Sequence, residues 1–222
     1  MGMSQSKNNI VSTKRTKLLL ACGTILGPLF YAIAIPQMFL RQGFDIRKNV
    51  ISMLSQGELG WLQVTNFLLT GLLAILCAVG LKQTLQGHRA GTWGSILIGI
   101  FGIGMIIAGI FKAPPGFGFP PGTPEGMPTE IGASAALHGI GFLVAFTSLI
   151  ICCFVFMRYF ISLRNRGMAT YSAITGIISP LLIILGQSNQ NLAGISFALV
   201  GAVAFGWLSI VAANLSSKLS KT

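Results

Sequence analysis

Charged side chains are scarce in this sequence, and acidic ones are the scarcest. Only 9% of the 222 residues are charged, and only four of them are Asp or Glu. A soluble domain is typically about 25% charged, so a water-soluble protein of this length could not cover its surface with so few charges. Hydrophobic residues make up 53% of the chain. This composition indicates that lipid, rather than water, is the main solvent.

The side chains that cofactor and metal sites need are also few. The chain has two histidines and four cysteines, and they lack the spacing of zinc ligands. Haem between helices usually needs two axial histidines, and only His138 lies deep in an apolar stretch. There is no phosphate-binding glycine loop and no nucleophile elbow. We expect no cofactor and no metal. We also expect Cys22, Cys77, Cys152 and Cys153 to be buried thiols without disulfides.

Basic residues are in excess, and the net charge is +11. In a soluble protein this would suggest nucleic acid. Here Lys and Arg flank the apolar stretches, where they anchor and orient helices, and no basic stripe interleaves with exposed aromatic residues. We therefore expect membrane lipids, and not nucleic acid, as partners.

Six apolar stretches are long enough to cross a bilayer, which takes about 20 residues of helix. Unpaired strand backbone cannot be satisfied in lipid, so each stretch is expected to be helical. Proline at Pro28, Pro36 and Pro180 should bend the first and fifth helices. The stretches cover residues 18–40, 62–81, 92–111, 131–157, 168–186 and 192–215.

The fold predicted from these stretches is an all-α membrane protein with a single domain of about six transmembrane helices. This domain covers residues 18–215, between a basic tail at 1–17 and a short tail at 216–222. Eleven basic residues lie on the side of both termini and four on the opposite side, so the positive-inside rule places both termini in the cytoplasm. An alternative is cleavage of the first stretch as a signal peptide after residues 32–34, which would leave five spans.

Small residues predict where helices approach closely. Gly194, Ala198, Ala202 and Gly206 recur every four residues in the sixth stretch. The third stretch is rich in glycine. These faces could pack within one bundle or form a homo-oligomer, and the spacing does not separate the two.

Two longer connections lie on the outer side. In the first, Ile46, Val50, Ile51 and Leu54 have helical spacing, which predicts a short amphipathic helix on the outer surface. Trp61 follows it and is expected at the water–lipid boundary. The second connection, 112–130, holds six of the nine prolines, so it is neither helix nor ladder strand. It is either an ordered lid on the bundle or a linker.

His138 is the one titratable side chain deep in a span, and such residues are functional-site hypotheses by default. Ser134 lies one helical turn from it, and Asn66 lies at a similar depth in the second span. His138 could instead serve only to bond a neighbouring helix. The candidate binding residues, expected to converge on one outer-facing polar pocket, are Asp45, Glu58, Trp61, Asn66, Ser134 and His138.

The sequence also resembles a family of bacterial and archaeal membrane proteins catalogued as a domain of unknown function, number 998. The resemblance covers about residues 20–215. The residues that carry it are Cys22-Gly23, Gly27-Pro28, Arg41, Gly43-Phe44-Asp45, Arg47, Ser52, Leu54-Ser55, Gly60-Trp61, Gln63, Asn66-Phe67, residues 71–73, residues 118–124 and His138.

This resemblance implies a polytopic protein of the bacterial cytoplasmic membrane with no established activity, and it supplies no catalytic residues. Pro114-Pro115 stand where the family has an Asp before a Pro. The missing carboxylate argues against acid–base chemistry in this loop.

Our leading hypothesis is a membrane protein that binds a lipid, a small amphiphile or a membrane partner in the outer-facing pocket. The first alternative is a lipid-modifying or hydrolytic enzyme that uses His138 as base. The second is a small-solute carrier. Ion-coupled transport usually leaves charges or broken helices near the midplane, and no Asp, Glu, Lys or Arg lies there in this sequence.

Overall fold

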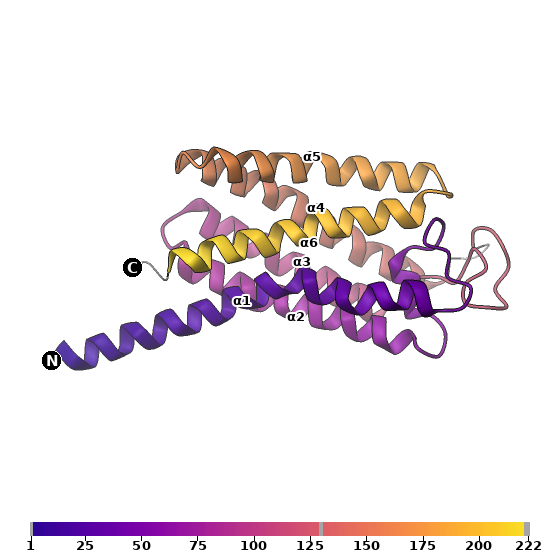
Figure 1. Ribbon diagram of the computed structural model, residues 1–222, viewed down its shortest axis with the longest axis horizontal. Coiled ribbons are helices and arrows are strands. Elements are labelled where there is room, and N and C mark those ends of the chain that lie inside the picture. The colour runs from indigo at the N-terminus through magenta and orange to yellow at the C-terminus, as the bar shows by residue number, and fades with distance from the viewer. Residues whose placement is uncertain (1, 129–130, 220–222) are drawn as a thin grey trace.

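The computed structural model describes residues 2–128 and 131–219, with side chains described from residue 13 onward. This part of the chain folds into long helices joined by short turns and two longer loops (Figure 1). A short 3-10 helix, η1 (Ile51–Ser55), follows α1, and a π-helical turn, η2 (Ala90–Gly94), leads into α3. The long helices are α1 (Gly2–Leu40), α2 (Gly60–Thr84), α3 (Ser95–Ile110), α4 (Ala133–Ser162), α5 (Arg166–Ser188) and α6 (Ala193–Lys218).

These helices form six candidate spans long and apolar enough to cross a membrane, and the third span, Ala90–Ile110, is made of η2 and α3 together. The prediction of an all-α chain with six candidate spans is therefore confirmed. The helices extend beyond the predicted stretches, most of all at the N-terminus, where α1 begins at Gly2. Residues 2–17 are thus helical and continuous with the first span. Helix α1 also continues through Pro28 and Pro36, and α5 through Pro180.

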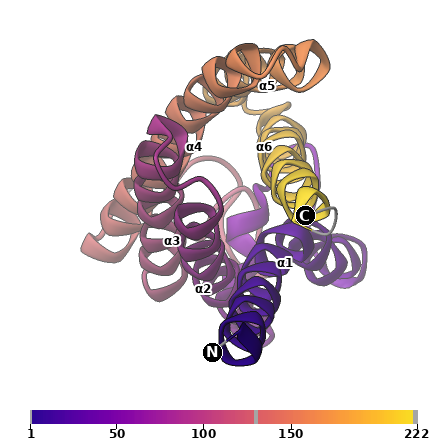
Figure 2. The ribbon, with the colours of Figure 1, turned by 90° about the vertical axis from the view of Figure 1, so that its left-hand side faces the viewer.

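The helices form a closed ring in chain order. Each helix packs against the next one in the sequence, and α6 returns to pack against α1 (Figure 2). The Gly27 N–H donates to Ser209 Oγ at 3.2 Å across this closing contact. Both termini lie at one end of the ring, here called the terminal end. The two longer loops, described over residues 41–59 and 111–128, lie at the other end, here called the loop end (Figure 1).

Glycines let α3 approach its two neighbours closely. A Cβ added at Gly71 of α2 would lie 2.5 Å from the Gly102 carbonyl oxygen, and one added at Gly104 would lie 2.7 Å from the Gly141 carbonyl oxygen of α4. Both distances are too short for any side chain, so these backbones touch. Gly102 and Gly104 of the third span therefore pack inside one bundle, whereas Gly99 has open space at its Cβ position.

The small-residue stripe of α6 is used only in part. Gly194 lies against the first loop, where an added Cβ would be 2.6 Å from the Asn49 carbonyl oxygen. Ala202, by contrast, is exposed, and Gly206 has open space around its Cβ position. The stripe therefore does not form a single packing face within the bundle. A homo-oligomer through its outward part stays a prediction.

Aromatic side chains fill the middle of the ring. Phe205 of α6 lies 5.0 Å from Phe30, 5.5 Å from Phe101 and 5.9 Å from Phe146, measured between ring centroids. Nearer the terminal end, the buried Trp207 donates its indole N–H to Ser172 Oγ at 3.0 Å and ties α6 to α5. The four cysteines are free thiols, and all but Cys22 are buried.

Candidate functional site

A cavity of about 320 Å³ lies inside the ring at the loop end. Every long helix contributes to its wall. Its lining is mostly apolar. The titratable side chains in the lining are the imidazole of His138 and the phenol of Tyr31. The aromatic lining residues are Phe30, Tyr31, Phe67, Phe117, Phe142, Phe146, Phe197 and Phe205.

The cavity has a floor, a roof and an open side. Phe146 and Phe205 of the aromatic core close it toward the middle of the ring. The loop-end roof consists of residues 50–53 from the first loop and Ala113, Pro114, Phe117 and Pro128 from the proline-rich loop.

The open side lies between α4 and α5. Gly139 of α4 and Gln187 of α5 both line the cavity, yet both are exposed at the protein surface. These two helices pack together nearer the terminal end and separate toward the loop end (Figure 1). The cavity is thus reached from the flank of the bundle, where a bilayer would lie.

His138 closes the C-terminal end of α3. Its Nδ1 lies 2.9 Å from the Ala108 carbonyl oxygen and 2.8 Å from the Phe111 carbonyl oxygen. Helix α3 ends at Ile110, so its last carbonyl groups have no partner within the helix. Carbonyl oxygens can only accept, so Nδ1 carries a hydrogen, which in a neutral imidazole leaves Nε2 without one. The lone pair of the ring is therefore on Nε2.

Ser134 acts one turn earlier on the same helix boundary. Its hydroxyl accepts from the Lys112 backbone N–H at 3.1 Å. The spacing of Ser134 and His138 does place them one turn apart, as expected, and both tie the start of α4 to the end of α3. The ring of His138 also packs edge-on to Phe67, with 6.1 Å between centroids.

Asn66 belongs to a buried amide cluster between α1 and α2 and does not line the cavity. Its Nδ2 donates to the Phe30 carbonyl oxygen at 3.0 Å, and Gln37 Nε2 donates to the Ile33 carbonyl oxygen at 2.9 Å. Both amides also donate to Gln63 Oε1, each at 3.3 Å. Because the backbone carbonyls fix the donors, Gln37 Oε1, Gln63 Nε2 and Asn66 Oδ1 are left buried without a protein partner.

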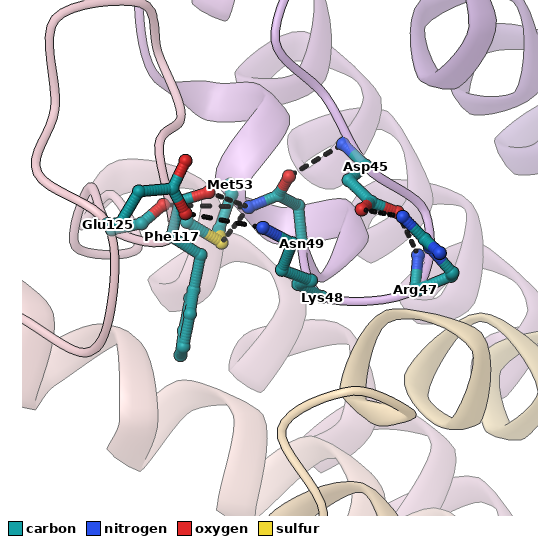
Figure 3. Close-up of polar contacts among 8 residues, drawn as sticks. Asp45, Arg47, Lys48, Asn49, Met53, Phe117 and Glu125 are labelled. Carbon is teal, nitrogen blue, oxygen red and sulfur yellow. Dashed lines mark hydrogen bonds and ion pairs between the residues drawn. The ribbon is translucent and has the colours of Figure 1, made fainter.

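Asp45 lies on the surface of the loop end and is already paired. Its carboxylate accepts from Arg47 Nε at 3.0 Å and from the Arg47 guanidinium at 2.8 Å (Figure 3). These hydrogen bonds lower the pKa of Asp45 to about 2. A carboxylate held in this way by its own loop is not available to a pocket.

Asn49 links the first loop to the proline-rich loop. It is almost fully buried. Its Oδ1 accepts from the Asp45 N–H at 2.7 Å, while its Nδ2 lies 3.5 Å from the carbonyl oxygens of Gly116 and Phe117 (Figure 3). Nearer the surface than Asn49, Lys48 Nζ forms an ion pair with Glu125 Oε2 at 3.2 Å.

Arg41 and Gln56 make a second link between the same two loops. The Arg41 guanidinium donates to the carbonyl oxygens of Leu54 and Gln56 and lies 5.3 Å from the centre of the Phe119 ring. The Gln56 side chain donates to the Ala113 carbonyl oxygen. Phe119 itself is fully buried. The proline-rich loop is thus held against the first loop by side chains from both.

The structure does not gather the six candidate residues into one polar pocket. His138 lines the cavity, whereas Glu58 and Trp61 are exposed, and Asp45, Asn66 and Ser134 bond elsewhere. The reason is local: Asp45 finds Arg47 two residues away, and Asn66 faces α1 rather than the interior of the ring. The pocket in this region is apolar.

The helix in the first loop differs from the amphipathic surface helix that was expected there. It is the five-residue 3-10 helix η1, and Ile51, Met53 and Leu54 are buried against the bundle rather than lying on the surface. Arg41 and Asn49, which link the two loops, were not among the predicted site residues. An amide side chain directly before the apolar residues Val50 and Ile51 was the available signal for Asn49.

A ring of six candidate membrane-spanning helices around a cavity that opens on the flank defines a polytopic α-helical membrane protein. Residues 24–214 match the family described as "protein of unknown function (DUF998)", and the chain belongs to this family. The resemblance noted from the motifs is thereby confirmed. No curated protein and no solved structure matches the chain.

Proposed function

We propose that this protein binds the apolar part of a lipid or small amphiphile in the loop-end cavity. The observation that carries the proposal is the lining, in which eight aromatic side chains surround about 320 Å³. Small-molecule sites have volumes of roughly 300–1,000 Å³ and mostly apolar walls. The open side between α4 and α5 lets a ligand enter from the membrane without crossing the loops.

His138 supplies the polar contact in this proposal. Since Nδ1 is held by two carbonyl oxygens, Nε2 is the atom left to accept a hydrogen bond. A hydroxyl or protonated amine at one end of the ligand would donate to it. The proline-rich loop serves as the lid, because Ala113, Pro114 and Phe117 form part of the roof.

The proposal includes an orientation. With eleven basic residues at the terminal end and in its connections, both termini face the cytoplasm, and the loop end faces the opposite side of a bacterial cytoplasmic membrane. Reporter fusions at residue 222 and within 120–124 test this. Activity of a cytoplasm-specific reporter at the loop would overturn it.

The test of ligand binding uses two glycines that have open space at their Cβ positions. Gly139→Leu places a side chain at the open side of the cavity, whereas Gly99→Leu places one on α3 away from the cavity. Both changes favour helix by about 1 kcal/mol, so neither should lower abundance. Native mass spectrometry after gentle extraction should show a bound amphiphile in the wild type and in Gly99→Leu, but not in Gly139→Leu.

If wild-type protein carries no ligand after gentle extraction, the binding proposal is wrong. If Gly139→Leu and Gly99→Leu retain equal amounts, the ligand sits outside this cavity.

An enzyme that uses His138 as base is a second candidate function, favoured by the fixed tautomer that leaves a lone pair on Nε2. His138→Asn separates the two candidates, because an Asn amide can keep the donor to Ala108 and Phe111 while removing the base. An enzyme would lose turnover of a lipid panel in His138→Asn. A binding protein would keep its fold in His138→Asn and would unfold only in His138→Leu.

A further inference from the structure

A second hollow, of about 650 Å³, lies at the terminal end between α4 and α5. Its walls combine two kinds of side chain. Met157, Ile161, Ala169 and Ala173 are apolar, whereas Arg164 and Arg166 are charged and exposed. Nothing in the loop-end cavity uses these residues.

The two arginines have no carboxylate within reach in the described part of the chain. Its acidic residues are Asp45, Glu58 and Glu125, and all three belong to the loops of the opposite end. The ion pairs found among the side chains of residues 13–128 and 131–219 involve only Arg47 with Asp45 and Lys48 with Glu125. Arg158 and Lys218 lie at the same end as the arginines and add charge of the same sign. The described residues therefore supply no anion that neutralises this hollow.

The position of the hollow indicates a source for such an anion. Helix α4 has 30 residues, so at about 1.5 Å per residue it is about 45 Å long. A bilayer with its headgroups is about 40–45 Å thick, and its hydrocarbon core about 30 Å. The α4–α5 turn with Arg164 then lies at the level of the lipid headgroups, while Ile161 and Met157 lie one and two turns deeper.

We propose that this hollow binds an anionic phospholipid, with Arg164 and Arg166 on the phosphate and the apolar walls against the acyl chains. A guanidinium matches phosphate geometry through two parallel N–H donors. Basic pockets between membrane helices on the cytoplasmic side hold anionic headgroups for this reason. The site is independent of the loop-end cavity, so either can exist without the other.

The experiment compares two double variants that remove the same charge from the same end. Arg164→Gln/Arg166→Gln alters the hollow, and the matched control Lys82→Gln/Arg89→Gln lies outside it. Purified full-length protein in detergent is titrated with phosphatidylglycerol, phosphatidylcholine or inorganic phosphate. Bound lipid is counted by native mass spectrometry, and melting without lipid checks that each variant folds.

Wild-type protein and the control should bind phosphatidylglycerol at least about tenfold more tightly than phosphatidylcholine. Both lipids offer a phosphate, but the choline ammonium brings a positive charge next to the two guanidinium groups, whereas the glycerol headgroup is neutral. Arg164→Gln/Arg166→Gln should lose this preference. Equal losses in the two double variants would show diffuse surface attraction and overturn the proposal. Two other results would also overturn the proposal. In the first, inorganic phosphate binds as tightly as phosphatidylglycerol, which would show a site for free anions. In the second, the wild-type protein binds the two lipids equally.

Discussion

The loop end and the terminal end of this protein hold their charged side chains in different ways. At the loop end, Asp45 and Glu125 each have a basic partner from the same end. At the terminal end, the described residues provide bases but no carboxylate. The loop end can therefore hold itself together, and it encloses an apolar cavity. An excess of bases at the terminal end suits a surface that meets anionic lipid headgroups, as proposed above.

The loops at the loop end and the turns at the terminal end are ordered by different contacts. Loops 41–59 and 111–128 contain little regular structure, yet they are held together by the buried side chains of Asn49 and Phe119 and by the partly buried Arg41 guanidinium. The turns at the terminal end are short and rely on the helices that they join. Replacing a side chain that links the two loops should therefore change the roof of the cavity while leaving the terminal end intact.

The largest effect is expected at Gly194, where α6 meets the first loop. A Cβ there would overlap with the Ile46 carbonyl and lie 2.6 Å from the Asn49 carbonyl oxygen, so Gly194→Val should destabilise the protein by about 3 kcal/mol. Gly206→Val is the control on the same helix, since its Cβ meets open space; it should change stability by less than about 0.5 kcal/mol. Melting in detergent measures both. Equal stability of the two variants would contradict the close contact at Gly194.

Asn49 should have the next largest effect. Asn49→Leu leaves the Asp45 N–H and the carbonyls of Gly116 and Phe117 without this partner, which should cost about 1–3 kcal/mol. Hydrogen exchange at the Phe117 and Gly118 amides, which bond to the Gly126 and Pro124 carbonyls, should become faster.

The exposed Asn191 provides the matched control for that change. Asn191→Leu should alter neither melting nor exchange at residues 117 and 118. If Asn49→Leu also leaves exchange unchanged, Asn49 does not fasten the proline-rich loop.

Acid should weaken the loop end through Asp45, with an effect of about 1 kcal/mol or less because the pair is near the surface. The side-chain hydrogen bonds from Arg47 lower the pKa of Asp45 to about 2 in the folded protein, against about 3.9 when unfolded. The stabilisation is thus fully present above pH ~4 and is lost as the pH falls toward 2. Melting of wild type and Asp45→Asn should differ at pH 6 and converge at pH 2. A difference that grows on acidification would contradict this assignment.

The smallest effect is expected for the outermost pair, Lys48 and Glu125. Glu125 is largely exposed, so a double-mutant cycle should give a coupling of about 0.5 kcal/mol that falls with added salt. The charge-reversed pair Lys48→Glu/Glu125→Lys should restore most of the coupling. A coupling above 2 kcal/mol would mean that this ion pair, and not Asn49, is the main fastener of the two loops.

Local sequence patterns predicted the helices well and the site poorly. A run of apolar residues shows by its length alone that it can cross a bilayer, so all six helices were found. His138 was found as well, because a titratable group inside such a run is rare. Asn49 was missed because its partner Gly116 is 67 residues away in the chain. Asn66 was misplaced because hydropathy does not show which face of a helix its neighbour covers.

The sequence by itself determined the solvent of this protein, its helices and the unequal division of its charges, because each of these follows from the composition of short contiguous segments. The tertiary structure alone decided that α6 closes on α1, that Nδ1 of His138 completes the end of α3, and that the loop end encloses a cavity. An empty volume is a property of no single segment. It exists only where side chains from six helices and two loops leave the space between them unfilled.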